Sequence, residues 1–198
     1  MECILGKNGD ELREAAKAGR HEEVDRLIRA GASVDIQDEY GNAALIESSR
    51  NGHGSIVDSL LRAGASVDIQ DDDGYTALIC ASSNGHGSIV DSLFRAGASV
   101  DIQNKYGNTA LIWASSNGHG SIVDSLIQQH RFLYYNGVDP NPLRLSLSTE
   151  SFAYLVSTSR ALCVTTLLAD NYVYMDVDST EELVQMLFAE YYTSDMDP

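Results

Sequence analysis

Three histidines recur at a fixed interval, and histidine is the side chain most often used to bind metal ions or move protons near neutral pH. His53, His86 and His119 are equally spaced, each within the sequence Asn-Gly-His-Gly-Ser. A zinc site needs its ligands within about 2 Å of one ion. Equivalent residues of stacked repeats lie too far apart for that. The spacing therefore predicts structural histidines in turns and no metal site.

A second pair with possible chemistry is His130 with Cys163, which could act as a base and a nucleophile. No orienting third residue and no oxyanion loop accompanies them in the sequence. The sequence also lacks a glycine-rich phosphate loop, a carboxylate pair in a suitable context and a Cys/His cluster. We therefore interpret Cys163 as a buried helical thiol and expect a protein that is not an enzyme and needs no cofactor.

The histidines belong to a longer sequence repeat. Residues 38–70 and 71–103 are identical at 25 of 33 positions, residues 104–127 continue the same sequence, and residues 5–37 end in the same phase. Such a repeat predicts a stack of similar units. Each unit must pack its apolar side chains against its neighbours, because its own helices are too short to be stable alone.

Each copy contains two helical patterns and an extended segment. In residues 38–70, a first helix is expected over residues 42–50 and a second over residues 55–62. Gly52 and Gly64 follow them and are expected in the left-handed backbone conformation. The first helix should bury Ala44, Leu45 and Ser49, and the second Ile56, Val57, Leu60 and Leu61. Phe94 and Ile127, which replace Leu61 in later copies, are expected in the core as well.

The repeat resembles the ankyrin repeat, whose unit of about 33 residues is a β-turn followed by two antiparallel helices. The family has a motif of the type G-x-T-P-L-H-x-A, and the matching residues here are 107–114, followed by Gly118-His119. Ala110 stands where the family has proline and Ile112 where it has histidine, which predicts a less rigid array of the same fold. The resemblance implies an all-α repeat solenoid of helix-turn-helix units with β-turn tips over residues 5–130.

The repeats divide most of the chain into units. Residues 5–37 are expected to form an N-terminal capping repeat, with Asp10 as the N-cap of its first helix. Full repeats follow at 38–70 and 71–103, and the repeat at 104–136 becomes degenerate after residue 127.

The C-terminal third has two open interpretations. In the first, residues 137–147 form a loop, residues 148–192 a divergent repeat with a capping helix, and residues 193–198 a flexible tail. In the second, this part is a small α+β module, because residues 143–148 and 172–177 alternate like strands.

Differences between the near-identical copies mark the positions that the stack leaves free. They gather at the turn tips and on the first helix, which in ankyrin-like stacks line the concave surface. The candidate partner-binding residues are Tyr40, Glu47, Asp72, Asp73, Tyr75, Cys80, Tyr106 and Trp113. Tyrosine and tryptophan are enriched at binding hot spots. For Asp71 a role in the turn is the better interpretation, and for Trp113 partial burial against the C-terminal segment is an equal alternative.

Charge and cysteine content limit the partners and the compartment. The chain has 29 acidic and 13 basic residues, a net charge of −16. Phosphates would be repelled, so neither nucleic acid nor an anionic membrane surface is an expected partner. Three cysteines without a C-x-x-C motif, no secretion signal and no long apolar run favour a cytoplasmic protein, with the nucleus as a second location.

Together these features predict a monomeric, non-enzymatic interaction scaffold. It would bind a basic or amphipathic segment of a partner protein on the concave face, because acidic tips attract Lys and Arg. One alternative is an array that targets a C-terminal effector module at residues 131–198. Another is an inert array with a scrambled end, in which the segment after Gln128 is not native-like.

Overall fold

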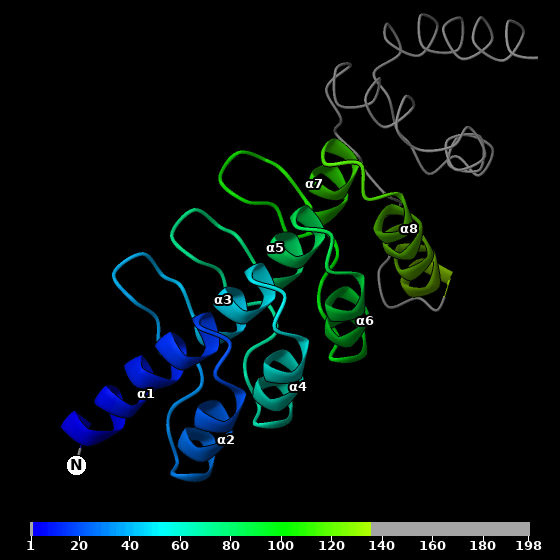
Figure 1. Cartoon of the computed structure of the whole chain (residues 1–198). Helices are drawn as coiled ribbons and strands as arrows, with labels where there is room; N and C mark the ends of the chain where they lie inside the picture. The colour runs from blue at the N-terminus through cyan, green and yellow to red at the C-terminus, as the bar shows by residue number, and fades with distance from the viewer. Residues whose placement is uncertain (1, 136–198) are drawn as a thin grey trace, which may run out of the picture. The chain divides into compact units, whose positions relative to one another are not determined.

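The computed structural model describes the backbone of residues 2–135 and the side chains of residues 8–129. Within that part the chain forms eight α-helices and no strand (Figure 1). The first helices of the repeats are α1 (Glu2–Lys17), α3 (Ala44–Arg50), α5 (Ala77–Ser83) and α7 (Ala110–Ser116). The second helices are α2 (His21–Arg29), α4 (Gly54–Arg62), α6 (Gly87–Arg95) and α8 (Gly120–Tyr135). The all-α repeat stack expected from the sequence is confirmed.

Residues 1–126 form one compact unit, and a second unit begins at Ile127. The expectations for residues 137–147, 148–192 and 193–198, including the α+β alternative, lie outside the described residues. None of the described helices is both long and apolar enough to cross a membrane.

The helices of the first unit lie in two rows. The first helices α1, α3, α5 and α7 pack in sequence. Helices α1, α3 and α5 also pack against the second helix of their own repeat, and α2, α4 and α6 pack in sequence behind them. The segments between one repeat and the next project from one edge as long loops (Figure 1). We call the outermost residues of these loops the hairpin tips: residues 38–42, 71–75 and 104–108.

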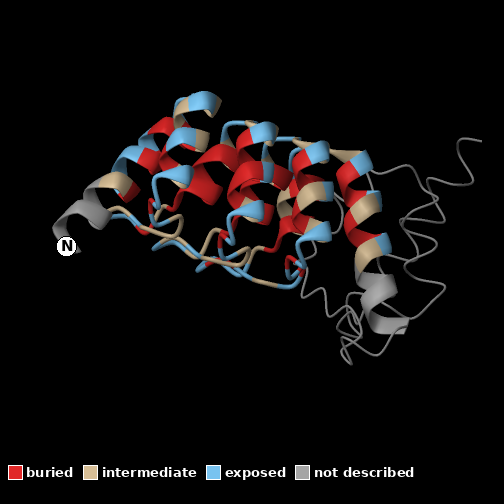
Figure 2. Cartoon of the chain, turned by 90° about the horizontal axis from the view of Figure 1, so that it is seen from below, coloured by how far each residue is buried: buried red, intermediate tan, exposed pale blue. Residues whose placement is uncertain are grey.

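The first helices of the central repeats are more completely buried than the second helices (Figure 2). In α3 and α5 every residue except the last is buried, because neighbours cover three sides of each helix. The second helices bury one stripe, which in α4 includes Ile56, Val57 and Leu60. Leu61 and Phe94 are only half-buried, so their expected place in the core is wrong, whereas Ile127 is buried. Leu61 follows Leu60 directly and therefore lies at the edge of the stripe.

The ends of the short helices follow from local chemistry. Gly52 and Gly64 have φ angles of 79° and 88°, as expected for glycine after a helix. Thr76 and Thr109 precede α5 and α7 and accept hydrogen bonds from Ile79 and Ile112 N–H at 3.2 and 3.4 Å. Ala43 precedes α3 with nearly the same backbone angles as Thr76 and provides no side-chain cap. Helix α3 starts at Ala44, slightly later than expected.

The N-cap expected at Asp10 is wrong. Helix α1 begins at Glu2, so Asp10 lies inside it and accepts a hydrogen bond from Arg13 at 2.9 Å. The helix passes through Gly9, which is buried, and a Cβ there would clash with the side chain of Ile36. Glycine at this position therefore lets α1 approach the residues that end the first repeat.

Hydrogen bonds between repeats hold the stack in register. The imidazole Nε2 of His53 lies 3.2 Å from the Lys17 carbonyl, and that of His119 lies 3.1 Å from the Ser83 carbonyl. A Cβ on Gly52 would lie 2.8 Å from the ring of His86, so the ring packs directly on the preceding repeat. The predicted structural role of the repeated histidines is confirmed.

Candidate functional site

Each hairpin tip is closed by a side chain that caps its own backbone. Asp71 Oδ1 accepts hydrogen bonds from the N–H groups of Asp73 and Tyr75 at 3.0 and 2.8 Å. Asp38 and Asn104 occupy the same position in the other tips and accept the equivalent bonds. Burial acts to raise the pKa of Asp38, but its hydrogen bonds from Asn42 and Tyr40 bring that pKa below its ordinary value. The predicted turn-forming role of Asp71 is confirmed.

The tips also pair with one another through the backbone. The N–H of Asp72 donates to the Tyr40 carbonyl at 2.9 Å, and the N–H of Lys105 donates to the Asp73 carbonyl at 2.9 Å. These bonds use only backbone groups, and the side chains of Tyr40, Asp72 and Asp73 remain exposed. Tyr40 and Tyr106 are 64% and 68% exposed, and Asp72 and Asp73 are exposed as well. Tyrosine is among the residues enriched at protein-binding hot spots, so these side chains are available for contact with a partner.

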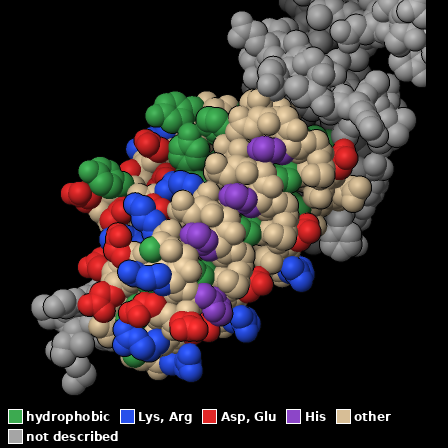
Figure 3. Space-filling view, in the orientation of Figure 1, with side chains coloured by type: hydrophobic (Ala, Val, Ile, Leu, Met, Phe, Trp, Pro, Cys, Tyr) green, Lys and Arg blue, Asp and Glu red, His purple; other side chains and the backbone are tan. Residues whose placement is uncertain are grey.

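Charged side chains crowd the side of the unit that carries the tips, beside a row of histidines (Figure 3). The five residues at positions 38, 39, 71, 72 and 73 are all acidic, and Lys105 is the one base among the same positions of the third tip. The surface between these tips and the first helices corresponds to the expected concave face, and we keep that name for it. Its outer rim is therefore acidic.

Glu47 differs from its expected exposure. It is 4% exposed and its Oε1 lies 2.9 Å from Nη1 of Arg50. The same guanidinium donates to Asn42 Oδ1 at 3.1 Å and to Asp71 Oδ2 at 3.3 Å. Glu47 is buried because Arg50 and the next repeat cover it, so it presents no surface to a partner.

Cys80 replaces Glu47 in the next repeat and is also buried, at 3% exposed. Burial raises the pKa of its thiol to about 11, although the nearby guanidinium of Arg50 acts in the opposite direction. The thiol is therefore neutral near pH 7. Its expected place on the accessible surface is wrong in the same way as that of Glu47.

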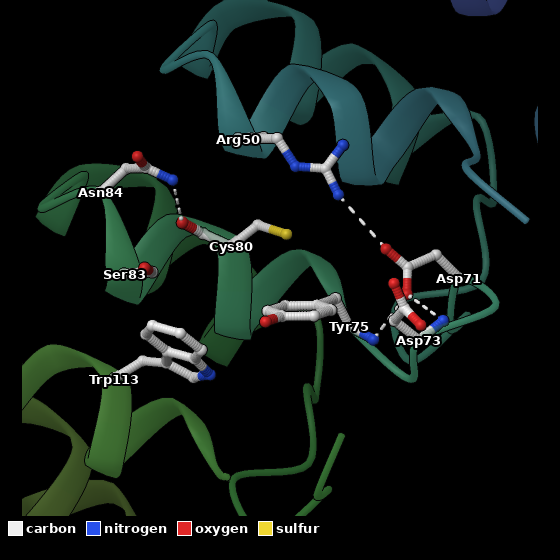
Figure 4. A pocket seen from close by; sticks show the side chains of 8 residues that line it. All are labelled: Arg50, Asp71, Asp73, Tyr75, Cys80, Ser83, Asn84 and Trp113. Atoms are coloured by element: carbon white, nitrogen blue, oxygen red, sulfur yellow. Dashed lines mark hydrogen bonds and ion pairs between the residues drawn. The ribbon is translucent and has the colours of Figure 1, made fainter. Parts of the chain in front are cut away.

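Beside Cys80 the concave face is hollowed by a cavity of about 320 Å³ (Figure 4). We call it the Tyr75–Trp113 pocket. Its lining comes from three successive repeats: Arg50 from α3, Trp113 from α7, and Tyr75, Cys80, Ser83 and Asn84 from the repeat between them. Asp71 and Asp73 lie at the tip side of the pocket.

The two aromatic residues of the pocket contact each other across a repeat boundary. The ring centroids of Tyr75 and Trp113 are 5.9 Å apart and the rings are inclined by 41°. Both side chains are half-buried. The indole Nε1 of Trp113 is buried and, among the described residues, has no hydrogen-bond partner. Such pairs stabilise by about 0.5–1.5 kcal/mol beyond the area they bury.

The structure therefore divides the candidate residues into three groups. Tyr40, Tyr106, Asp72 and Asp73 are exposed at the tips, Tyr75 and Trp113 line the pocket with Cys80, and Glu47 lies behind Arg50. Arg50 and Ser83 were not among the candidates, although both line the pocket. A signal was present in the sequence, since positions 50, 83 and 116 carry Arg, Ser and Ser in otherwise near-identical copies.

Comparison with known proteins identifies the repeat. A family model described as ankyrin repeats matches the chain three times, over residues 12–104, 55–142 and 82–180. The third match continues well beyond residue 127, where the chain departs from its own template. A search of curated proteins finds no match to the chain.

Proposed function

Because the chain belongs to the ankyrin repeat family, whose repeats are generally protein–protein interaction modules, we propose that it is a non-enzymatic scaffold that binds a basic or amphipathic segment of a partner protein on its concave face. The family is typically non-enzymatic. The observation that carries the proposal is the pair of exposed tyrosines, Tyr40 and Tyr106, at tips with an acidic rim.

The charges support a basic partner. Asp38 and Asp71 are occupied by their own turns and by Arg13 and Arg50, which lie 3.7 and 3.3 Å from the two carboxylates. Glu39, Asp72 and Asp73 are exposed, and none of them belongs to an ion pair among the described residues. Exposed carboxylates at a rim steer a positively charged partner toward the aromatic contacts. The same proposal places the protein inside the cell, which its cysteine content favours. It also takes the chain to be a monomer.

The proposal is tested by selecting binders from a random dodecapeptide library on the immobilised full-length chain. We expect enriched peptides that contain Lys or Arg. The concave-face variant Tyr40→Ser, Asp72→Ser, Tyr106→Ser should weaken their binding by about tenfold or more, because truncating one hot-spot residue costs about 2 kcal/mol or more. Light scattering of the free chain checks that it is a monomer.

The matched control changes the second helices instead. Asp58→Ser with Asp91→Ser removes two exposed carboxylates, which is more charge than the concave-face variant loses. If loss of net charge alone weakened binding, this control would have the larger effect. Equal binding to both variants, or peptides no more enriched than on a blank surface, would sink the proposal.

A further inference from the structure

The Tyr75–Trp113 pocket has a counterpart one repeat earlier that is filled by the chain itself. Arg50 and Ser83 occupy equivalent positions of successive repeats, at the ends of α3 and α5. Arg50 extends its guanidinium between Glu47 and the carboxylate of Asp71 in the next tip. Ser83 is too short to reach the equivalent place. The pocket is therefore the space beside Ser83. In the preceding repeat the equivalent space is occupied by the side chain of Arg50.

The residues that surround Arg50 change together one repeat later. Glu47 becomes Cys80 and Asp71 becomes Asn104, so both carboxylates of the Arg50 site are lost along with the guanidinium. Position 42, which holds Asn42 beside Arg50, becomes Tyr75. The pocket thus offers a cation an aromatic wall, formed by the Tyr75 and Trp113 rings, in place of buried acids.

The remaining charges at the pocket favour a cation. Arg50 lies at one side of it, but Glu47 and Asp71 already pair with that guanidinium. Asp73 adds a further carboxylate, which is exposed at the tip side. Among the residues that line the pocket one base stands against two acids, Asp71 and Asp73, so the lining is net negative. Stacking of a guanidinium on tyrosine or tryptophan is favourable, and more so where the guanidinium is desolvated, as in a pocket.

We propose that the Tyr75–Trp113 pocket binds one arginine side chain of the partner segment, stacked on the aromatic wall and oriented toward Asp73. This rests on the proposed function, since it assigns a place on the concave face to one residue of the basic segment. The volume of about 320 Å³ is enough for an arginine side chain together with some water. The planar guanidinium suits a stacked site better than the compact ammonium of lysine.

The chain contains one tryptophan, Trp113, so its fluorescence reports on the pocket directly. We expect acetyl-Gly-Arg-Gly-amide, titrated into the full-length chain, to change the emission in a saturable way. The matching citrulline peptide has the same shape without the charge and should bind about tenfold more weakly, and the lysine peptide should be intermediate. Citrulline binding as tightly as arginine would overturn the proposal.

Two pairs of variants locate the binding. Ser83→Arg should fill the pocket from within, as Arg50 does one repeat earlier, and weaken arginine-peptide binding by about tenfold or more. Ser116→Arg adds the same charge at the equivalent, exposed position of the last described repeat and should change it less than about twofold. If Ser83→Arg unfolds the chain, the exposed substitution Asp73→Asn serves instead, with Glu39→Gln as its control.

The outcomes separate this proposal from the proposed function. Peptides from the dodecapeptide library that need Tyr40 and Tyr106 but contain no arginine, and bind Ser83→Arg normally, would refute the pocket and leave the scaffold intact. Equal loss in Ser83→Arg and Ser116→Arg would also refute it, because the effect would then be general repulsion.

Discussion

At the residue scale, one register position of the first helix takes three different side chains. Glu47, Cys80 and Trp113 occupy it in successive repeats, and their environments differ accordingly. Glu47 is paired with Arg50, Cys80 is a neutral thiol, and Trp113 packs on Tyr75. The repeat backbone therefore accepts an ion pair, a small apolar group or an aromatic ring at the same place. The residue one turn later changes with the first of these replacements, from Arg50 to Ser83, and is again serine at position 116.

Arg50→Met should lower the free energy of unfolding by about 2 kcal/mol, because it leaves the carboxylate of Glu47 buried without its cation. The double variant Glu47→Cys, Arg50→Ser reproduces the pair found at Cys80 and Ser83 and should lose much less than the sum of its single variants. Urea denaturation of the full-length chain measures all of these proteins. Additive losses would show that the two residues act independently.

Cys80 should make stability depend on pH in the alkaline range. Its pKa rises from an ordinary value of 9.0 to about 11 in the folded chain, so the unfolded chain loses this proton first. The free energy of unfolding should therefore be unaffected below about pH 8 and fall by about 2–3 kcal/mol between about pH 9 and 11. Cys80→Ala should flatten the curve in that range. Parallel curves for both proteins would assign the pH dependence to other groups.

At the element scale, the first helices are stable only because the stack surrounds them. Each of α3, α5 and α7 has seven residues, far fewer than an isolated helix needs. Their starts are defined by the residue just before them: Thr76 and Thr109 cap α5 and α7, but Ala43 does not cap α3. The second repeat therefore lacks a hydrogen bond that the third and fourth have.

Ala43→Thr should raise the free energy of unfolding by about 0.5–1 kcal/mol by supplying that cap. Ala43 and Thr76 have nearly identical φ and ψ angles, −99° and 166° against −98° and 167°. Both residues are almost fully buried, so a threonine at position 43 would lie in surroundings similar to those of Thr76. Ala43→Val has the same shape without the hydroxyl and is the control. Equal gains from threonine and valine would assign the effect to packing.

At the scale of the whole molecule, the net charge of −16 should govern how fast a basic partner arrives. Association of a selected basic peptide should slow by about tenfold between about 50 and 500 mM NaCl, while dissociation changes much less, because salt screens long-range attraction. Stopped-flow measurement of Trp113 fluorescence provides both rates. An association rate independent of salt would argue against an electrostatic role for the acidic rim.

The amino-acid sequence alone determined the architecture of the described residues. Each repeat contacts only itself and its neighbours, so the helices, the turn glycines and the core of one copy apply to every copy. The same regularity predicted that the repeated histidines have a structural role. The start of α1 was not predictable in this way, because the first unit matches the other copies only towards its end and because Gly9, a poor helix former, does not indicate a helix from the sequence.

The tertiary structure alone decided which variable positions reach the surface. The copies show that positions 47, 50 and 73 differ, but they do not show that Arg50 covers Glu47 or that Ser83 leaves a cavity open. Those outcomes depend on side chains from three repeats at once, at distances set by how the units stack. Sequence periodicity describes each repeat separately, whereas the pocket exists only between them.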